Sequence, residues 1–322
     1  MRAIVIETSG GADELALREV PDPIPGPDEV LVDVAAAGLN FIDTYHRSGL
    51  YPMDFPFIPG LEGAGTIVGL GSAVDGLAVG DRVGWTGALG SYAERHVVPS
   101  ANAIPVPDDI DIEDAAAVLL QGLTAHYLAT DTFPLGAGTR CLIHAGAGGV
   151  GLLLTQIAAM KGAHVITTVG THQKAEMSRG AGADDVIVYT DTDFKAAVQD
   201  LVGVKALDVV YDGVGKATFH DSIDLLRPRG LMVTFGNSSG PVPEISPLLL
   251  MQKGSLFLTR PTIGDYLQSR DELLGRANDL FTWITDGDLE VTIGARYPLE
   301  EAADAHRAME ARETVGKVLI VP

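Results

Sequence analysis

The chain has 322 residues, 46% of them hydrophobic and 20% charged, which favours a globular protein of two domains with separate cores. Its formal net charge of −21 at pH 7 argues against nucleic acid or an anionic membrane as a partner, because a surface of that sign repels both. No apolar run reaches membrane-spanning length, the N-terminus reads as a strand rather than a signal peptide, and there is a single cysteine, so we expect a cytoplasmic protein.

Residues 1–122 carry many Gly and Pro turns and show no alternation of strands with helices. Proline-rich turns at 21–27 and 55–60 separate short apolar runs such as 29–35 and 64–69. This pattern predicts an antiparallel, partly closed sheet for the first part of the chain.

Residues 123–260 alternate strands with helices, which predicts a doubly wound parallel sheet. The expected strands are 140–145, 164–169, 184–189, 207–212, 230–235 and 255–260. We expect the remaining residues, 261–322, to return to the first domain. They read as a helix at 270–285, a strand at 295–298, a helix at 299–310 and a closing strand at 316–321.

A glycine motif marks the start of this alternating region. Gly146, Gly148 and Gly151 spell G-x-G-x-x-G between an apolar strand and a helical pattern. In that context the first glycine allows a tight turn, the second lets a pyrophosphate approach the backbone, and the third lets the helix pack on the strand. The helix then offers free N–H groups and the positive end of its dipole to the phosphates. We therefore expect a dinucleotide to bind here.

The next turn indicates which dinucleotide is bound. An NAD enzyme places Asp or Glu after the second strand to bind the ribose hydroxyls, but no carboxylate lies between Leu152 and Ala175. The turn instead reads Gly-Thr-His-Gln-Lys at 170–174, with a cation where a 2′-phosphate would lie. We interpret this as selectivity for NADPH, with Lys174 as the charge partner of the phosphate. The alternative is that Lys174 is only a solvated residue in the first turn of a helix.

Over essentially its whole length the chain resembles the medium-chain dehydrogenases/reductases, and among them the zinc-free, zeta-crystallin-like quinone oxidoreductases. The segments that carry the resemblance are 37–51, 59–65, 78–83, 121–127, 144–151, 169–174, 235–240 and 258–261. The resemblance implies an α/β fold in which a GroES-like, mostly-β substrate domain is joined to a Rossmann domain. The substrate domain would be residues 1–122, completed by 261–322, and the NADP-binding domain residues 123–260. It also implies NADPH as the reductant, a small-molecule quinone as the acceptor, and usually a homodimer, which we expect to form along the outer strand at 254–260.

The zinc-dependent branch of the superfamily has a Cys at the position of Asn40, a His at the position of Leu61, and a lobe of closely spaced cysteines. This chain has none of these, although Glu62 remains. Without such ligands no metal would polarise an alcohol or carbonyl, so we assign no metal site. Quinones and activated enones accept reducing equivalents without a metal, given position and a donor for the developing oxyanion. An enone or 2-enoyl reductase therefore stays open as the alternative, as does cofactor binding without turnover, and the choice between one- and two-electron transfer is not decided.

The resemblance places Asn40, Phe41 and Tyr45 beside the nicotinamide end of the cofactor. Asn40 and Tyr45 would hydrogen-bond the carboxamide, the ribose or the acceptor oxygen. Tyr51 would line the acceptor cavity or, equally, be an amphipathic residue at a domain interface. Asn40, Tyr45 and Tyr51 are thus the candidate catalytic residues. Asp43 is expected to anchor the loop as a cap or an Asx-turn rather than to donate a proton, because nothing nearby in the sequence would raise its pKa.

The other cofactor contacts implied by the resemblance follow the domain junction and the strand ends of the nucleotide-binding region. They are Thr124, Tyr127, Gly146, Gly148, Gly149, Val150, Gly170, Thr171, Lys174, Tyr189, Gly213, Phe235, Asn237, Ser238, Thr259 and Arg260. Gly213 stands where relatives commonly have Ser, so only its backbone would approach the cofactor. Lys317 is expected to reach the phosphates from the closing strand.

Overall fold

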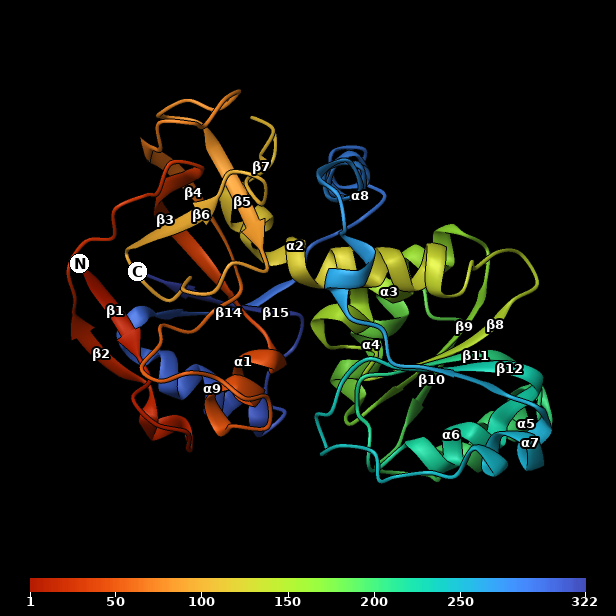
Figure 1. Cartoon of the computed structure of the whole chain (residues 1–322). Helices are drawn as coiled ribbons and strands as arrows, with labels where there is room; N and C mark the ends of the chain where they lie inside the picture. The colour runs from red at the N-terminus through yellow and green to blue at the C-terminus, as the bar shows by residue number, and fades with distance from the viewer. The chain divides into compact units, whose positions relative to one another are not determined.

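The computed structural model describes all 322 residues, and the chain forms two compact units (Figure 1). Unit 1 comprises Met1–Leu123 and Leu267–Pro322, and unit 2 comprises Thr124–Tyr266. The chain passes from the first unit to the second within helix α2 (Ile112–Tyr127). Unit 2 is thus inserted into the sequence of unit 1. No helix of the chain combines the length and the apolar character that crossing a membrane requires.

Unit 1 is built on a seven-stranded sheet, in which six strands follow the order β14-β15-β3-β4-β5-β7 and β6 pairs with β3. Their bounds are β3 (Glu29–Leu39), β4 (Glu62–Leu70), β5 (Arg82–Thr86), β6 (Arg95–Pro99), β7 (Ile104–Pro105), β14 (Ile293–Pro298) and β15 (Lys317–Val321). A separate ribbon pairs β1 (Arg2–Val5) with β2 (Ala16–Glu19). Most of these pairs are antiparallel, as the turn-rich sequence predicts, and only β14 pairs with β15 in parallel.

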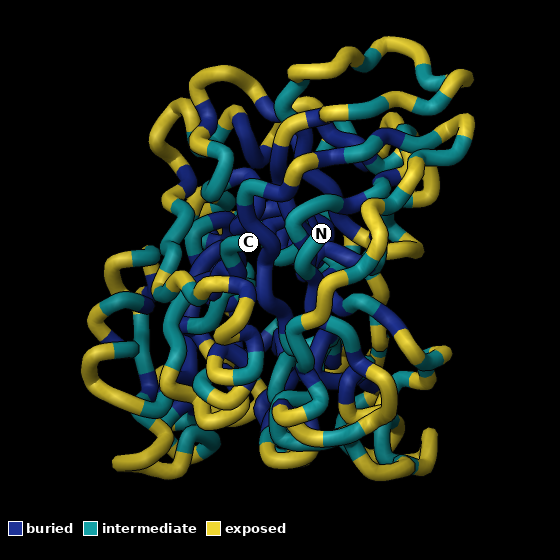
Figure 2. Tube along the Cα trace, turned by 90° about the vertical axis from the view of Figure 1, so that its left-hand side faces the viewer, coloured by how far each residue is buried: buried dark blue, intermediate teal, exposed yellow.

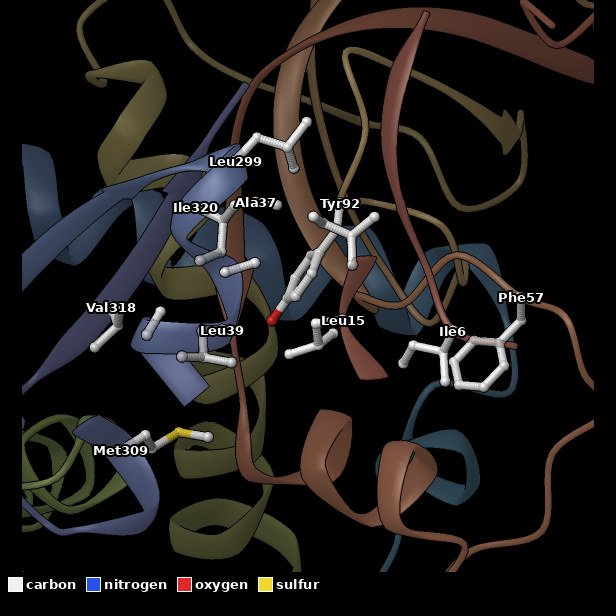
Figure 3. Packing of buried hydrophobic residues seen from close by; sticks show 13 residues of the cluster. Ile6, Leu15, Ala37, Leu39, Phe57, Tyr92, Leu299, Met309, Val318 and Ile320 are labelled. Atoms are coloured by element: carbon white, nitrogen blue, oxygen red, sulfur yellow. The ribbon is translucent and has the colours of Figure 1, made fainter. Parts of the chain in front are cut away.

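Four helices belong wholly or mainly to unit 1: α1 (Phe41–Ser48), α2, α8 (Arg270–Thr285) and α9 (Ala302–Glu310). The predicted helix at 270–285 is confirmed as α8. The helix predicted at 299–310 begins instead with a 3-10 turn, Leu299–Glu301, directly after Pro298. Residues of α9, β3 and β15 bury one hydrophobic cluster, in which the ring of Tyr92 lies among aliphatic side chains (Figure 3). Helix α1 lies in a region for which the sequence predicted only strands and turns.

Unit 2 contains a six-stranded, fully parallel sheet with the strand order β10-β9-β8-β11-β12-β13. The strands are β8 (Arg140–His144), β9 (His164–Val169), β10 (Asp185–Val188), β11 (Leu207–Asp212), β12 (Leu226–Thr234) and β13 (Phe257–Thr259). In chain order this is 3-2-1-4-5-6, the doubly wound order of dinucleotide-binding domains. All six predicted strands are confirmed, although β12 begins four residues earlier than predicted, because Leu226 pairs with Leu207 ahead of a register shift.

The helices of unit 2 connect its strands: α3 (Gly149–Met160), α4 (His172–Gly180), α5 (Phe194–Val202), α6 (Phe219–Leu225) and α7 (Pro247–Gly254). The strands β8, β9 and β11 are buried almost throughout, as expected for a parallel sheet covered on both faces. Figure 2 shows the buried residues of the chain gathered inside and the exposed ones along its outer loops. The predicted α/β class is therefore confirmed. Parallel strands end at one edge of the sheet, so the loops that follow them are brought together there.

Candidate functional site

The glycine motif of unit 2 forms the turn between β8 and α3. The residue with a positive φ in this turn is Ala145, at 55°, and not Gly146. The sequence predicts a glycine at 146 because of a tight turn, and this reason is wrong. Gly146 is needed because a Cβ there would lie 2.5 Å from Cβ of Thr167 on β9. Gly151 fits the prediction, because a Cβ there would overlap the carbonyl oxygen of Ala145 and push the helix away from the turn.

The start of α3 is open to an anion. Its N-cap, Gly148, has no side chain to accept from the first-turn N–H groups, and no acidic residue lies in that turn. A Cβ on Gly148 would meet only the Ala145 carbonyl oxygen, at 3.3 Å. Gly149 and Val150 therefore present backbone N–H groups at a positive helix end, as a pyrophosphate requires.

The turn after β9 gathers the residues predicted to bind the adenosine phosphate. The Thr171 hydroxyl caps α4 by accepting a hydrogen bond from N of Lys174, at 3.2 Å. A Cβ on Gly170 would lie 2.7 Å from the hydroxyl of Tyr189, a side chain that is 42% exposed. The first turn of α4 contains no carboxylate, and the imidazole of His172 lies 3.0 Å from Asp191. A half-buried lysine and a hydroxyl at a helix N-terminus fit a phosphate.

The loops after β11 and β12 are tied together at the same edge of the sheet. The buried carboxylate of Asp212 accepts hydrogen bonds from N of Val214, at 2.7 Å, and N of Gly215, at 3.0 Å. Ser238 donates its backbone N–H to O of Gly213, at 3.2 Å, and a Cβ on Gly213 would lie 3.1 Å from the ring of Phe235. Gly213, Phe235, Asn237 and Ser238 are therefore neighbours in space, as the sequence predicts for parallel strand ends.

Arg260 follows β13 and donates from Nη1 to O of Gly236, at 2.9 Å, which attaches the residues after Thr259 to the same loop. Tyr127, which was expected to flank the phosphates, is only 2% exposed and stacks on Tyr266 with ring centroids 4.2 Å apart. Burial also raises the pKa of Tyr127. The structure thus gives Tyr127 a packing partner, and Thr124, one turn before it, is buried as well.

Strand register explains how a polar cluster forms inside unit 1. In the antiparallel pair of β15 with β3, Val318 lies opposite Leu39, so Lys317 comes beside Asn40. In the pair of β3 with β4, Ala37 lies opposite Gly63, which places Glu62 next to Gly38. The ammonium of Lys317 accordingly donates to Glu62 and to Oδ1 of Asn40, the latter at 3.0 Å. These three side chains are at most 3% exposed.

Every hydrogen-bonding position of the Asn40 amide is used within unit 1. Nδ2 donates to O of Gly38, at 3.1 Å, and to Glu62, at 2.8 Å, while Oδ1 accepts from Lys317 and from Gln121, both at 3.0 Å. An amide has two donors and two acceptor positions, so none is left for a carboxamide or an acceptor oxygen. In this structure Asn40 positions its neighbours.

Lys317 was expected to reach the cofactor phosphates, but its partners lie within unit 1. Its ammonium pairs with Glu62, and Glu62 accepts from N of Leu120 as well, at 2.6 Å. Burial lowers the pKa of Lys317 while the Glu62 carboxylate opposes that shift. Gly38 is required for this pair, because a Cβ there would overlap both side chains. A lysine so enclosed neutralises Glu62 and does not extend to a phosphate.

Asp43 is the residue that sequence reasoning misjudged most clearly. It is fully buried, and burial raises its pKa to about 7. Its Oδ2 accepts from N of Asn40, at 2.8 Å, and from the hydroxyl of Tyr92, at 3.0 Å. Oδ1 is buried without a partner. The cap role was foreseen, but the groups that enclose the carboxyl come from distant segments, so no local pattern revealed the raised pKa.

The aromatic candidates of unit 1 lie together on α1 and the turn after it. The rings of Tyr45 and Tyr51 meet edge to face with centroids 5.2 Å apart, and Phe41 lies 6.4 Å from Tyr45. Tyr45 is 8% exposed, whereas Phe41 and Tyr51 are half buried. Gln121, which was not among the predicted residues, donates to Asn40 and keeps a buried Oε1 without a partner. Such an acceptor beside Asn40 suits an amide or hydroxyl of a bound molecule.

His144 is enclosed in the core of unit 2. His144, at the end of β8, is buried between the hydroxyls of Thr168 and Ser222, each 2.8 Å away, and burial lowers its pKa. Both ring nitrogens of His144 thus have partners within unit 2. No group of three or more His, Cys, Asp or Glu side chains is arranged to hold a metal ion.

Comparison with known proteins agrees with this geometry. Residues 26–108 match the alcohol dehydrogenase GroES-like domain, and residues 181–320 match the zinc-binding dehydrogenases. The chain is 46% identical over 317 residues to a quinone oxidoreductase of Pseudomonas aeruginosa, with 97% of each chain covered. It is also 38% identical over 330 residues to the 2-haloacrylate reductase of a Burkholderia species, covering 99% of this chain and 98% of the relative.

Among solved structures, Escherichia coli quinone oxidoreductase complexed with NADPH matches with a TM-score of 0.98 and 42% identity over the full length of both chains. The fold and these matches show that the chain belongs to the medium-chain dehydrogenases/reductases, and within them to the quinone oxidoreductase family. The sheet-rich unit 1 and the parallel sheet of unit 2 are therefore the GroES-like and Rossmann parts that the resemblance implied.

Proposed function

We propose that the chain is an NADPH-dependent quinone oxidoreductase that needs no catalytic metal ion. The observation that carries this proposal is the pair of turns in unit 2, one a glycine cradle at a helix N-terminus and the other a lysine-bearing turn without a carboxylate. Two relatives in the family, at 42% and 46% identity, are named quinone oxidoreductases, and one was solved with NADPH bound. The turns favour NADPH as the cofactor, and the relatives favour a quinone as the acceptor.

The residues of unit 2 fit the cofactor. The N–H groups of Gly149 and Val150 would hold the pyrophosphate, and the close packing at Gly146 keeps that turn in place. Lys174 and the Thr171 hydroxyl would hold the 2′-phosphate, which distinguishes NADPH from NADH. The bound cofactor supplies the reducing equivalents, and the protein orients the acceptor and provides for its proton.

The polar cluster of unit 1 supports a reaction without zinc. The ammonium of Lys317 lies between Asn40 and Glu62 and neutralises the one carboxylate retained from the zinc-dependent pattern. Asn40 is an amide with all its hydrogen bonds made, and Leu61 offers no ligand atom. A quinone requires less activation than an alcohol or a simple ketone, so position and hydrogen bonding suffice.

A side-by-side assay tests the substrate class. NADPH oxidation is followed with 1,4-benzoquinone, 9,10-phenanthrenequinone and a crotonyl thioester at equal concentrations. We expect turnover with both quinones and little or none with the thioester. Turnover with the thioester alone would reject the quinone assignment, and binding of NADPH without turnover of any acceptor would reject an enzymatic role.

A second candidate is reduction of an activated carbon–carbon double bond. It is favoured by the similarity to 2-haloacrylate reductase along almost the whole of both chains. Such an acceptor also takes a hydride and a proton and would occupy the same site. Adding 2-chloroacrylate to the assay decides between them: a higher kcat/KM for the acrylate than for either quinone would assign the chain to this reaction.

We also propose that the protein is a cytoplasmic homodimer joined along β13, the edge strand of the parallel sheet. The apolar side chains Phe257 and Met251 are each 61% exposed, and Leu248 on α7 is 60% exposed. An unpaired edge with exposed apolar residues is typically covered by another chain, and a second copy can pair antiparallel to the same edge. Light scattering after size exclusion is expected to give a dimer for the wild type and a monomer for Phe257→Asp. A wild-type monomer at micromolar concentration would reject this interface.

A further inference from the structure

A directed chain of hydrogen bonds leads to Asp43 inside unit 1. Arg47 lies on α1, one turn after Asp43, and its guanidinium is 3% exposed. Nη1 of Arg47 is 3.0 Å from Nδ1 of His306, and Nε2 of His306 is 3.3 Å from the Tyr92 hydroxyl. That hydroxyl is in turn 3.0 Å from Oδ2 of Asp43. All four side chains are buried, and the outer end is fixed by a 2.6 Å ion pair of Arg47 with Glu310.

The direction of every bond in this chain follows from Arg47. A guanidinium only donates, so Nδ1 of His306 must accept. Burial and the Arg47 charge lower the pKa of His306 to about 3, so the ring is neutral and carries its hydrogen on Nε2. Nε2 therefore donates to Tyr92, and Tyr92 donates to Asp43. Because arginine does not release its proton, this row of hydrogen bonds does not conduct protons from Glu310. Its effect is to fix the Tyr92 hydroxyl as a donor to Oδ2 of Asp43.

The two oxygens of the Asp43 carboxyl group differ in their hydrogen-bond partners. Oδ2 receives two donors, from Tyr92 and from N of Asn40, whereas Oδ1 is buried with no partner. The charged groups that face this carboxyl are Lys317, which lowers its pKa, and Glu62, which raises it. Burial outweighs the rest, and the pKa stands at about 7. A carboxyl group in this setting exchanges one proton near neutral pH.

The reduction proposed above consumes one proton for each NADPH oxidised, whether the electrons pass one at a time or as a hydride. NADPH supplies two electrons and one hydrogen, so a quinone needs that further proton to become the hydroquinone. The proton can come from a group that remains partly protonated at pH 7. Asp43 has that proton affinity, and it lies three residues after Asn40 and two residues before Tyr45 on α1. Glu62 is unsuited, because its two oxygens are already engaged by hydrogen bonds from Asn40, Lys317 and Leu120.

We propose that Asp43 is an exchangeable proton site, with the proton on Oδ1, that supplies the proton consumed when the acceptor is reduced, and that the Arg47–His306–Tyr92 chain positions it. In each turnover the carboxylic acid would give one proton to the acceptor as it is reduced, leaving the Asp43 carboxylate. Solvent returns the proton before the next turnover. This inference rests on the proposed function for its proton demand, but the proton site itself exists without the cofactor.

The test is an infrared titration of the protein without cofactor. The C=O band of a protonated, buried carboxylic acid is followed from pH 5 to 9, and Asp43→Asn serves to assign it. We expect one band with a midpoint near pH 7 that is absent from the variant. Tyr92→Phe, which removes one donor from Oδ2, should raise the midpoint by about one pH unit, a tenfold gain in proton affinity. Tyr211→Phe, which removes a buried hydroxyl in unit 2, should not move it.

A wild-type protein with no titrating band between pH 5 and 9, or a midpoint that Tyr92→Phe leaves unchanged, would overturn the proton site. Quinone turnover at pH 7 that is equal in the wild type and in Asp43→Asn would overturn the supply of the proton. If Asp43→Asn does not fold, the Tyr92→Phe shift decides alone. A band that titrates as expected in a protein without quinone activity would reject the proposed function and leave the proton site standing.

Discussion

At the scale of single residues, charge decides what the site can recognise. Lys174 stands in the first turn of α4, beside the Thr171 hydroxyl and with no carboxylate in that turn. The sequence showed this directly, because the cation and the missing carboxylate are local features. Lys317 is the opposite case: its partners Glu62 and Asn40 are brought to it by strand register, so the sequence suggested a phosphate where the structure has a buried carboxylate.

Replacing Lys174 with Ala should weaken NADPH much more than NADH. The expected loss for NADPH is about 1–3 kcal/mol, the range for a lost charged hydrogen bond. Fluorescence titration of both cofactors measures it, with Lys161→Ala, at the C-cap of α3, as the matched control. Equal losses for the two cofactors would remove Lys174 from this role.

Lys317→Met should lower the free energy of unfolding by about 3–5 kcal/mol, because it leaves the Glu62 carboxylate buried without its partner. Adding Glu62→Gln to the same chain should restore part of this loss, since the buried charge is then gone. Urea unfolding of the two single variants and the double variant measures the coupling. Losses that simply add would show that the pair is not coupled.

At the scale of elements, the sequence predicted the strands of unit 2 and helix α8 well, because their apolar patterns are continuous and their ends are marked by turns. It did not predict α1, whose N-cap Asn40 lies in a stretch that reads as strand and turn. Nor did it predict the cluster around Asp43, which depends on Tyr92 and His306 from other elements. Local pattern specifies elements, whereas the burial of a carboxyl group is a tertiary property.

The three glycines of the β8–α3 turn should respond differently to alanine. Gly146→Ala and Gly151→Ala place a Cβ against the backbone or β9, so both should lose stability by several °C in Tm. Gly148→Ala meets only one oxygen at 3.3 Å, so it should keep its Tm but bind NADPH at least tenfold more weakly, because the Cβ occupies the approach of the pyrophosphate. Thermal unfolding and cofactor titration check this. A Gly148→Ala protein with full affinity would contradict the cradle.

At the scale of the whole molecule, buried histidines set the response to acid. Burial lowers the pKa of His96 to about 4 and that of His306 to about 3. Both rings bind a proton in the unfolded chain near pH 6.5, so their contribution to stability is present above that pH and is lost as the pH falls towards 4. Asp43 acts in the opposite direction, because its raised pKa stabilises the fold at low pH and this is lost as the pH rises through about 7.

On unfolding between pH 6 and 4.5, His96 and His306 each take up about one proton, His46 and His144 add to this uptake because burial lowers their pKa values too, and Asp43 releases about one proton. Each proton taken up contributes a slope of about 1.4 kcal/mol of unfolding free energy lost per unit of falling pH. His96→Phe removes one of these histidines and should reduce the slope by about that amount. Urea unfolding at several pH values measures it, and an unchanged slope in the variant would show that His96 titrates normally in the folded protein.

The central claim is that this protein reduces quinones with NADPH and without a metal ion. The most direct measurement is NADPH oxidation by 1,4-benzoquinone on a sample whose zinc content has been determined by elemental analysis. We expect turnover that is saturable in NADPH, is far weaker with NADH, and proceeds at full rate with less than a tenth of a zinc ion per chain. Activity that appears only with stoichiometric zinc, or a protein that does not bind NADPH, would contradict the account.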